Sequence, residues 1–208
     1  MQADHSVTLD IWSDYVCPFC YLELPVIDRL QQDFGPRLEV RWHAFELRPD
    51  PAPTLDPQGA YLHDIWTRRV YPMAHARGMT LHLPPVQPRS RKAFEAVEHA
   101  RTLGHFNAMH RALFRAFFEE GRDIGDTETL LDVGAAAHLE RDPLKDVLDT
   151  GRYTHRVLDQ EQHARKLGIG GVPLTLVHLV GRDLSDAIAV NGAVEIDELR
   201  DAILQVAR

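Results

Sequence analysis

Residues 7–21 read Val-Thr-Leu-Asp-Ile-Trp-Ser-Asp-Tyr-Val-Cys-Pro-Phe-Cys-Tyr, and this stretch decides the fold. It begins with an apolar, β-prone run that ends at Ser13-Asp14, which predicts a strand over residues 7–12 followed by a loop. Cys17 and Cys20, the only two cysteines of the chain, come directly after that loop. The sequence therefore predicts a pair of cysteines just beyond the end of a strand.

A helix is predicted to begin at Pro18. Apolar residues recur at helical spacing from there to Phe34, and Gly35-Pro36 supplies the stop. Pro25 falls inside this pattern, so we expect a kink or a longer irregular opening turn. Residues 38–45 then alternate apolar and polar side chains, as a second strand does. The chain thus opens with strand, helix and strand, and Cys-x-x-Cys lies at the start of the helix.

The middle of the chain differs in kind from its start. Residues 48–57 contain four prolines, which predict an irregular connection. Residues 59–167 show helical spacing of apolar side chains, interrupted by glycines and prolines, and no convincing alternation of the kind that marks a strand. Asp126 is expected to cap one of these helices with its side chain. We therefore predict that residues 56–169 form an all-helical insertion subdomain.

The end of the chain returns to strands. Residues 174–180 form an apolar run that predicts a buried strand, and residues 187–190 predict a short partner strand. Apolar residues at helical spacing over 196–206 predict a closing amphipathic helix. The predicted fold class is therefore α/β, with one discontinuous domain built from residues 1–55 and 170–208.

Composition excludes several kinds of function. The chain has 208 residues and a formal charge of −8, which argues against a nucleic-acid binder because such a protein needs a basic face. No run approaches the roughly 18 apolar residues of a membrane span, and Met1–Ser6 lacks the pattern of a secretory signal. We therefore expect no nucleic-acid or membrane partner and a cytoplasmic location. Structural disulfides are rare in that compartment, so two cysteines this close favour redox or metal chemistry.

The cysteine pair fits redox chemistry. At the start of a helix, unpaired backbone N–H groups and the helix dipole stabilise a thiolate, so Cys17 is the expected nucleophile. Cys20, one turn further, is placed to attack a mixed disulfide at Cys17 and release the substrate. Pro18 suits the first helical position because an N–H there would have no helical partner. The spacing alone leaves zinc open, since half of a zinc site has the same pattern.

Histidine spacing argues against zinc. The chain has 12 histidines, but no H-x-x-x-H or H-E-x-x-H pair that would complete a tetrahedral site with the two cysteines. We therefore predict no metal ligands. A non-catalytic zinc or interaction module is the alternative from a different functional class.

The order of elements resembles a known family. A strand, Cys-Pro-Phe-Cys, a helix, a strand, a long helical insertion and then Gly171-Val172-Pro173 before a further strand look like the DsbA family of thioredoxin-fold proteins. Residues 12–21, together with the stretch Phe45-Glu46-Leu47-Arg48-Pro49-Asp50, most resemble the FrnE-like branch. That branch is related to 2-hydroxychromene-2-carboxylate isomerases and kappa-class glutathione transferases. Those relatives usually have serine where this chain has Cys17.

The resemblance implies a thioredoxin-like fold and a thiol–disulfide oxidoreductase. Cys17 would be the nucleophile and Cys20 the resolving thiol, and Pro173 would follow a cis peptide bond and face the cysteines. Val172 could then pair with a bound substrate in strand fashion. The Cys17–Cys20 disulfide would itself be the redox group, so no separate cofactor is expected. The implied partners are a thiol- or disulfide-bearing protein or small molecule and an unidentified thiol recycling system.

The same relatives supply a rival activity. A glutathione-dependent isomerase or transferase of aromatic or polyketide-like small molecules would use Cys17 in place of the serine. Glutathione would then be a co-substrate. The presence of both cysteines favours dithiol–disulfide chemistry over this alternative.

Two features depart from strongly oxidising DsbA proteins. Pro18 and Phe19, which are expected to support the site, stand where those proteins have Pro-His, so one donor to the nucleophilic thiolate is absent and a less oxidising potential is expected. Ile11 stands where thioredoxin-like proteins have a buried acid six positions before the first cysteine. Asp10 and Asp14 flank that place without matching it, so the group that handles protons is unassigned.

Other side chains near the cysteines are weaker candidates. Tyr15 and Tyr21 could form an apolar rim that contacts substrate, and Asn191-Gly192 ends the last predicted strand close to the expected site. His43 and Glu46 lie near the end of the second predicted strand. They could influence the titration of the sulfurs, but we expect them on a solvated edge.

Overall fold

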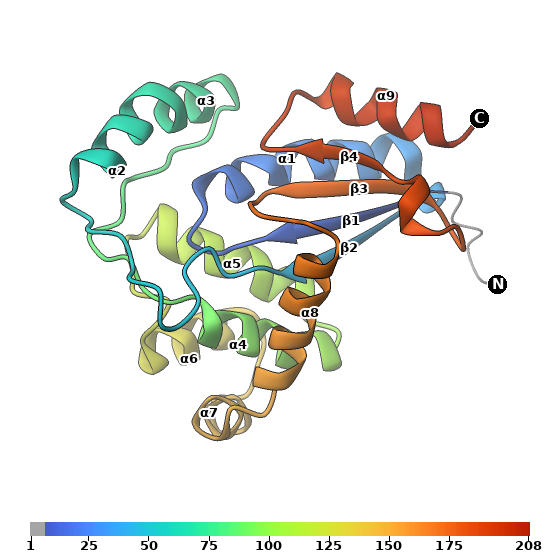
Figure 1. Ribbon diagram of the computed structural model, residues 1–208. Helices are drawn as coiled ribbons and strands as arrows, with labels where there is room; N and C mark the ends of the chain where they lie inside the picture. The colour runs from blue at the N-terminus through green and yellow to red at the C-terminus, as the bar shows by residue number, and fades with distance from the viewer. Residues whose placement is uncertain (1–6) are drawn as a thin grey trace.

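The strand predicted ahead of the cysteines lies in the middle of a four-stranded sheet of order β2-β1-β3-β4 (Figure 1). The computed structural model describes residues 7–208; residues 1–6, where we predict no secretory signal, lie outside the described residues. The strands are β1 (Val7–Ser13), β2 (Leu38–Ala44), β3 (Leu174–Leu179) and β4 (Ile188–Asn191). β1 is parallel to β2 and antiparallel to β3, which is antiparallel to β4. The two ends of the chain thus build one sheet, as the α/β thioredoxin-like prediction requires.

Side chains of β1 alternate between the two faces of the sheet. Leu9 and Ile11 pack in one cluster with apolar residues of α1 (Pro18–Phe34) and α9 (Ile196–Val206). Trp12 points to the other face, where it is buried against Ala164 of α8 (Thr154–Lys166). Helices therefore cover both faces, which explains why every residue of β1 is buried.

α1 begins and ends where the sequence predicts. Pro18 occupies its first turn, and Gly35 follows its last residue with φ of 56°, a left-handed value that glycine adopts without a steric penalty. Pro25 lies within the helix, so the opening turn is helical and not irregular. This helix carries Cys20 on its first turn and presents its apolar face to β1.

All regular structure between β2 and β3 is helical. Asp126 caps α6, where its Oδ2 accepts the backbone N–H of Thr129 at 2.9 Å, which confirms the predicted cap. The predicted boundaries after residues 55 and 169 fall in irregular segments. The helices of this part are α2 (Ala60–Ile65) and a π-helical turn (Trp66–Val70), then α3 (Tyr71–Ala76), α4 (Arg91–Thr102), α5 (Phe106–Phe118), α6 (Thr127–Ala136), α7 (Arg141–Thr150) and α8.

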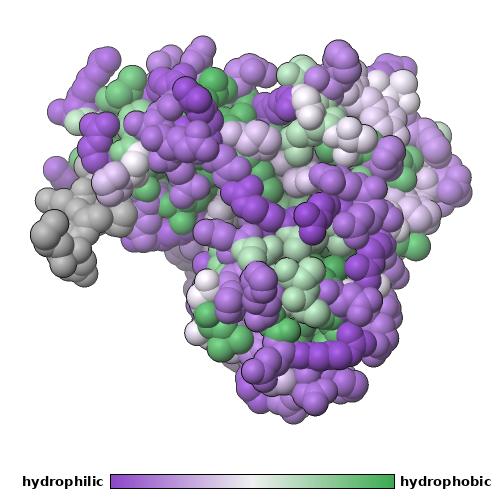
Figure 2. All heavy atoms as spheres, turned by 180° about the vertical axis from the view of Figure 1, so that it is seen from behind, coloured by the Kyte–Doolittle hydropathy of each residue, from purple (hydrophilic) through white to green (hydrophobic). Residues whose placement is uncertain are grey.

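The helical part has a core of its own. Phe114, Phe117 and Phe118 of α5 are almost fully buried, and the same cluster includes Cys17 and Cys20. Seen from behind, the surface is mainly hydrophilic, with a patch of hydrophobic side chains over the lower, helical part (Figure 2). None of the helices in residues 7–208 has both the length and the apolar character needed to cross a membrane. Because both cysteines belong to this core and directly follow β1, they lie where the sheet meets the helical part.

Candidate active site

The two cysteines lie at the amino end of α1, directly beyond β1. The chain turns tightly there, and the backbone N–H of Cys17 donates to the carbonyl of Asp14 at 3.1 Å. Cys17 is the N-cap residue, and Pro18 takes the first helical position, where no donor is left unpaired. The backbone N–H of Cys20 donates to the carbonyl of Cys17 at 3.1 Å. Both side chains are free thiols, 4% and 0% exposed respectively.

The loop before β3 reaches the same place from the other end of the chain. The thiol of Cys17 donates to the carbonyl oxygen of Val172 at 3.5 Å, and the peptide bond between Val172 and Pro173 is cis. The backbone N–H of Gly192 donates to the carbonyl of Pro173 at 2.8 Å, and Asn191 lies beside the start of β3. The structure therefore brings Cys17, Val172 and Pro173 together, and Asn191-Gly192 lies behind Pro173.

Cys20 is shut off from solvent beneath the turn. The backbone N–H of Asp14 donates to its Sγ atom at 3.5 Å. Burial raises the pKa of the Cys20 thiol well above its ordinary value, and the hydrogen bond and charge of Cys17 add to the rise. The N–H of Asp14 acts in the other direction, because donation to sulfur favours the thiolate. Cys20 is therefore a thiol at neutral pH.

An apolar hollow of about 240 Å³ opens at Cys17. Pro18 and Phe19 line it from the start of α1, and Trp66 lines it from the π-helical turn after α2. Further apolar walls come from α2, α5 and two loops, through Leu47, Leu55, Leu62, Ile65, Phe118 and Val172. A substrate sulfur at Cys17 could thus be accompanied by carbon groups buried on this surface.

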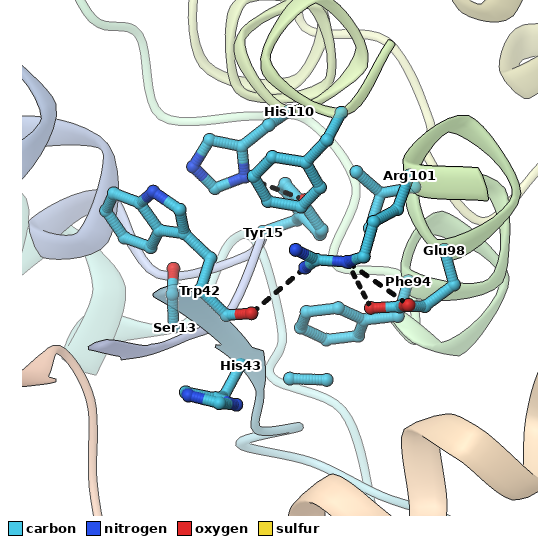
Figure 3. A pocket seen from close by; sticks show the side chains of 11 residues that line it. Ser13, Tyr15, Trp42, His43, Phe94, Glu98, Arg101 and His110 are labelled. Carbon is cyan, nitrogen blue, oxygen red and sulfur yellow. Dashed lines mark hydrogen bonds and ion pairs between the residues drawn. The ribbon is translucent and has the colours of Figure 1, made fainter. Parts of the chain in front are cut away.

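Tyr15 and Tyr21 do not line this hollow. Tyr15 is buried, and its hydroxyl lies 2.8 Å from Nδ1 of His110 (Figure 3). Burial lowers the pKa of His110 to about 3, and neighbouring arginines add to the effect, so its ring is neutral. Tyr21 stacks on Phe114 and donates its hydroxyl proton to Glu119. Both tyrosines therefore pack in the core of the helical part and not along the walls of the hollow.

Asp14, which the sequence left unassigned, is fully buried beneath the turn. Its Oδ2 accepts the backbone N–H of Leu47 at 2.7 Å, and its Oδ1 accepts that of Val16 at 3.3 Å. Burial raises the pKa of Asp14 to about 6, although these bonds and one from Ser90 oppose the rise. Because β1 and β2 are parallel, the loops after them meet at one edge of the sheet. That rule is the signal that could have predicted the contact between Asp14 and Leu47.

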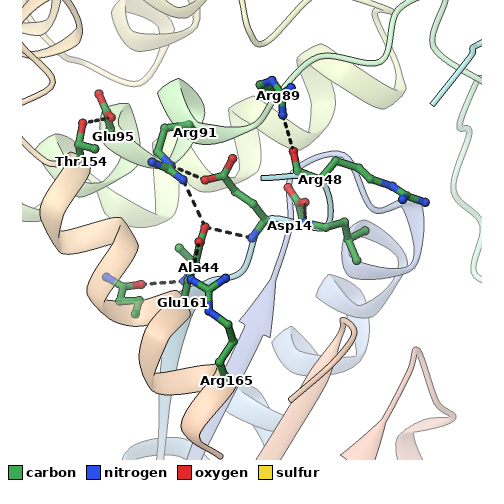
Figure 4. A network of polar contacts seen from close by, with 12 residues as sticks. Asp14, Ala44, Arg48, Arg89, Arg91, Glu95, Thr154, Glu161 and Arg165 are labelled. Atoms are coloured by element: carbon green, nitrogen blue, oxygen red, sulfur yellow. Dashed lines mark hydrogen bonds and ion pairs between the residues drawn. The ribbon is translucent and has the colours of Figure 1, made fainter. Parts of the chain in front are cut away.

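Glu46 corrects a sequence prediction. It is 5% exposed and does not lie on a solvated edge, because it contacts Arg91 of α4 and Glu161 of α8. Its carboxylate accepts from Arg91, and its backbone N–H donates to Oε1 of Glu161 at 3.3 Å (Figure 4). Burial raises the pKa of Glu46 to about 7, and Glu161 adds to the rise while Arg91 opposes it. A buried carboxyl network thus lies next to Asp14.

His43 likewise has a buried partner. Its Nε2 lies 2.6 Å from Oδ1 of Asp10, and Nε2 of His178 lies 2.7 Å from Oδ2 of the same carboxylate. The side chain of His43 is 25% exposed, so the predicted solvated edge is wrong for most of its surface. Within residues 7–208, no group of three or more His, Cys, Asp or Glu residues could hold a metal ion.

Comparison with known proteins shows which family the sequence matches. The profile of the DSBA-like thioredoxin domain matches residues 8–204. YwbO, an uncharacterised protein of Bacillus subtilis (strain 168), is 31% identical over 176 residues, which are 83% of this chain and 87% of YwbO. The match to the family thus includes both cysteines, the helical part and the strands that follow it.

Three solved structures share the fold. A probable DsbA oxidoreductase from Streptomyces coelicolor has a TM-score of 0.78 at 23% identity, over 96% of this chain and 89% of that one. A 2-hydroxychromene-2-carboxylate isomerase has a TM-score of 0.76 at 21% identity, over 97% and 96%. The cytosolic disulfide reductase DsbM from Pseudomonas aeruginosa has a TM-score of 0.71 at 22% identity, over 95% and 97%. At these identities the likeness shows the fold alone.

Proposed function

Because the chain belongs to the family of DSBA-like thioredoxin domains, we propose that it is a thiol–disulfide oxidoreductase whose reactive groups are Cys17 and Cys20. The observation that carries the proposal is the position of Cys17 at the amino end of α1, beside Val172 and the apolar hollow. Unpaired N–H groups at a helix start favour a thiolate there. Cys20 is buried one turn away, so a sulfur held at Cys17 reaches it more readily than a free substrate does.

Reduction of a substrate proceeds in two exchanges. The Cys17 thiolate attacks one sulfur of a substrate disulfide, forms a mixed disulfide and releases the other sulfur as a thiolate. Cys20 then loses its proton and attacks the sulfur of Cys17, which forms the Cys17–Cys20 disulfide and releases the second substrate thiolate. Both released thiolates take protons from water, and two electrons pass from the protein to the substrate. Oxidation of a substrate dithiol is the reverse sequence.

Substrate contacts in this proposal come from both ends of the chain. Pro18, Phe19 and Val172 line the hollow, and Pro173 holds the backbone next to Cys17. An external thiol or disulfide system must restore the starting state, since the chain has only these two cysteines. A cytoplasmic location belongs to the same proposal, and DsbM, which shares the fold, is described as a cytosolic disulfide reductase.

Insulin reduction by dithiothreitol tests the proposed activity. The wild type should accelerate the reaction, and Cys17→Ser should return it to the uncatalysed rate because the nucleophile is lost. Cys20→Ser should instead accumulate a mixed disulfide at Cys17, which mass spectrometry detects. A wild-type rate equal to the uncatalysed one would contradict the proposal.

The redox potential is a second test of the same site. Phe19 supplies no donor to the Cys17 sulfur, so we expect a potential below that of proteins with Pro-His at these positions. Phe19→His should raise the potential by about 30 mV, since a donor stabilises the thiolate of the reduced form. Equilibration with glutathione buffers measures the potential. An unchanged value in Phe19→His would show that the side chain at this position does not reach the sulfur.

The apolar hollow also supports a second candidate function, a glutathione-dependent isomerase or transferase of aromatic small molecules. Phe19, Trp66 and Phe118 give the hollow aromatic walls, and a 2-hydroxychromene-2-carboxylate isomerase and a glutathione-bound form of DsbM share the fold. Glutathione binding measured by calorimetry separates the two functions. Binding and turnover that survive Cys20→Ser would favour the isomerase, whereas turnover that needs both cysteines would favour disulfide exchange.

A further inference from the structure

The hollow at Cys17 continues into a second one. A neighbouring hollow of about 310 Å³ is lined by Arg48, Thr54, Pro88 and Gly170 at its far end. The two hollows share five lining residues, so they form one cleft. The shared residues are Val16, Leu47, Leu55, Tyr61 and Gln87. The cleft therefore runs from an apolar end at Cys17 to a more polar end at Arg48.

Among residues 7–208, Arg48 is the only charged residue that lines either hollow. No aspartate or glutamate of the described residues belongs to the walls, although the chain as a whole carries a net charge of −8. The charge in the cleft is thus opposite in sign to that of the molecule. An anionic group would find at Arg48 the one formal positive charge that the described lining residues supply.

The guanidinium of Arg48 is available to a ligand. The side chain is exposed, and it makes no ion pair with any residue in the described range 7–208. Asp50, the acid two residues away, is occupied by Arg89, whose Nη2 lies 3.1 Å from its carboxylate. Arg89 also donates to the backbone carbonyl of Arg48, which ties down the backbone at this position. The loop is therefore held in place while the charged group of Arg48 stays unpaired.

We propose that Arg48 selects substrates: the cleft takes small disulfides or thiols that carry a carboxylate or similar anionic group, with the anion at Arg48 and the sulfur at Cys17. This inference rests on the disulfide exchange proposed above. Carbon atoms between the two groups lie along Leu47, Leu55 and Tyr61, which border both hollows. An exposed guanidinium contributes modestly, so the selection is a preference of about fivefold and weakens as salt screens the charge.

Three small disulfides of different charge test the selection. Reduced protein is mixed with excess dithiodipropionate, hydroxyethyl disulfide or cystamine, which are anionic, neutral and cationic, and the loss of its reactive thiols is followed. For each compound the rate of Arg48→Gln is divided by the wild-type rate, which cancels differences in intrinsic reactivity. The ratio should fall about fivefold for dithiodipropionate, stay near unity for hydroxyethyl disulfide and rise for cystamine. Arg48→Glu should extend the same order.

Arg68→Gln is the matched control. It removes the same charge from an exposed arginine that pairs with Asp64 and lies outside both hollows, so its three ratios should all stay near unity. Equal ratios for the three disulfides in Arg48→Gln would overturn the selection by Arg48. Failure of the wild type to react with any of the three would instead overturn the proposed disulfide exchange. Melting temperatures check that the exposed substitutions leave the fold intact.

Discussion

Asp10 and Asp14 are two buried aspartates only four residues apart, yet their surroundings push their pKa values in opposite directions. Asp10 is 6% exposed and receives Nε2 of His43 and of His178. Burial would raise its pKa, but the hydrogen bonds and charges of the two histidines outweigh burial and lower it. Asp14 is 0% exposed and has only uncharged donors, so burial raises its pKa to about 6. The charge of the partner, and not depth alone, decides whether a buried carboxyl stays ionised.

The two aspartates also have different roles: Asp10 holds strands together, whereas Asp14 lies beside the reactive cysteines. Asp10 ties three strands together, since it lies on β1 while its partners lie on β2 and β3. Asp14 shapes the turn before the cysteines, and its own backbone N–H reaches Cys20. The position that holds an acid in thioredoxin-like proteins is Ile11, which packs in the core under α1 and α9. Of the two aspartates, Asp14 is thus the one that contacts the cysteine pair.

The largest expected effect comes from removing Asp10. Asp10→Ala leaves the buried His178 and the partly exposed His43 without their acceptor, so we expect a loss of about 3–5 kcal/mol in the free energy of unfolding. Urea denaturation followed by circular dichroism measures it. Asp126→Ala, which removes an exposed helix cap, is the control and should cost only about 1 kcal/mol. A loss of similar size in both variants would mean that the contacts of Asp10 with the two histidines contribute no more to stability than an exposed helix cap does.

The pH dependence of stability should separate the two acids next. The pKa of Asp14 rises from 3.8 to about 6 on folding, so the folded state holds this proton more tightly than the unfolded chain. That contribution to stability is complete below about pH 4 and is lost as the pH rises through 6, a change of about 3 kcal/mol. Asp14→Asn cannot titrate. The difference in unfolding free energy between wild type and Asp14→Asn should therefore fall by about this amount between pH 3 and pH 8.

Asp10 should give the opposite sign. Its pKa is lower in the folded protein than the ordinary 3.8, so its contribution to stability is present above about pH 4 and is lost as the pH falls. Asp10→Asn should thus narrow the gap to wild type only in strong acid. If the unfolding free energies of Asp10→Asn and Asp14→Asn changed with pH in parallel, the two carboxyls would not have pKa values shifted in opposite directions.

Local patterns in the sequence were sufficient to predict most of the fold. The apolar spacing after Pro18 and the stop at Gly35 predict α1, because a helix depends on near neighbours. The environment of Glu46 could not be predicted in this way, since Arg91 and Glu161 reach it from distant helices. The predicted substrate contact of Tyr15 is wrong for the same reason, because the residue that its hydroxyl contacts, His110, is 95 residues away in the sequence. Proximity of Cys17 to Pro173 was expected only from the resemblance, because no pattern within the sequence joins the two ends of the chain.

Reactivity of Cys20 gives a smaller but more direct readout of Asp14. In a Cys17→Ser background, Asp14→Asn replaces one of the two acceptor oxygens that hold the turn, so the N–H that faces Cys20 is less well placed. Alkylation of Cys20 should slow about tenfold at a fixed pH, and its pH profile should move up by about one unit. Asp10→Asn is the control, because Asp10 contacts neither cysteine.

Two outcomes of this experiment are informative. A profile in Asp14→Asn that superimposes on that of the Cys17→Ser parent would show that the turn does not depend on the carboxylate. An equal shift in Asp10→Asn would attribute the effect to general loosening of the sheet. Ser90→Ala removes a milder contact of Asp14 and should shift the profile in the same direction by a smaller amount.

The smallest expected effect concerns the partly exposed partner of Asp10. His43 both bonds Asp10 and stacks on Trp12, with ring centroids 4.7 Å apart. His43→Phe keeps an aromatic ring for the stack but removes the donor, so it should cost about 1 kcal/mol and should raise the pKa of Asp10. His43→Gln keeps a donor and loses the ring, so it should leave that pKa nearer its wild-type value. If both variants raised the pKa of Asp10 equally, the buried His178 alone would account for its ionised state, and the contrast with Asp14 would rest on one charged partner.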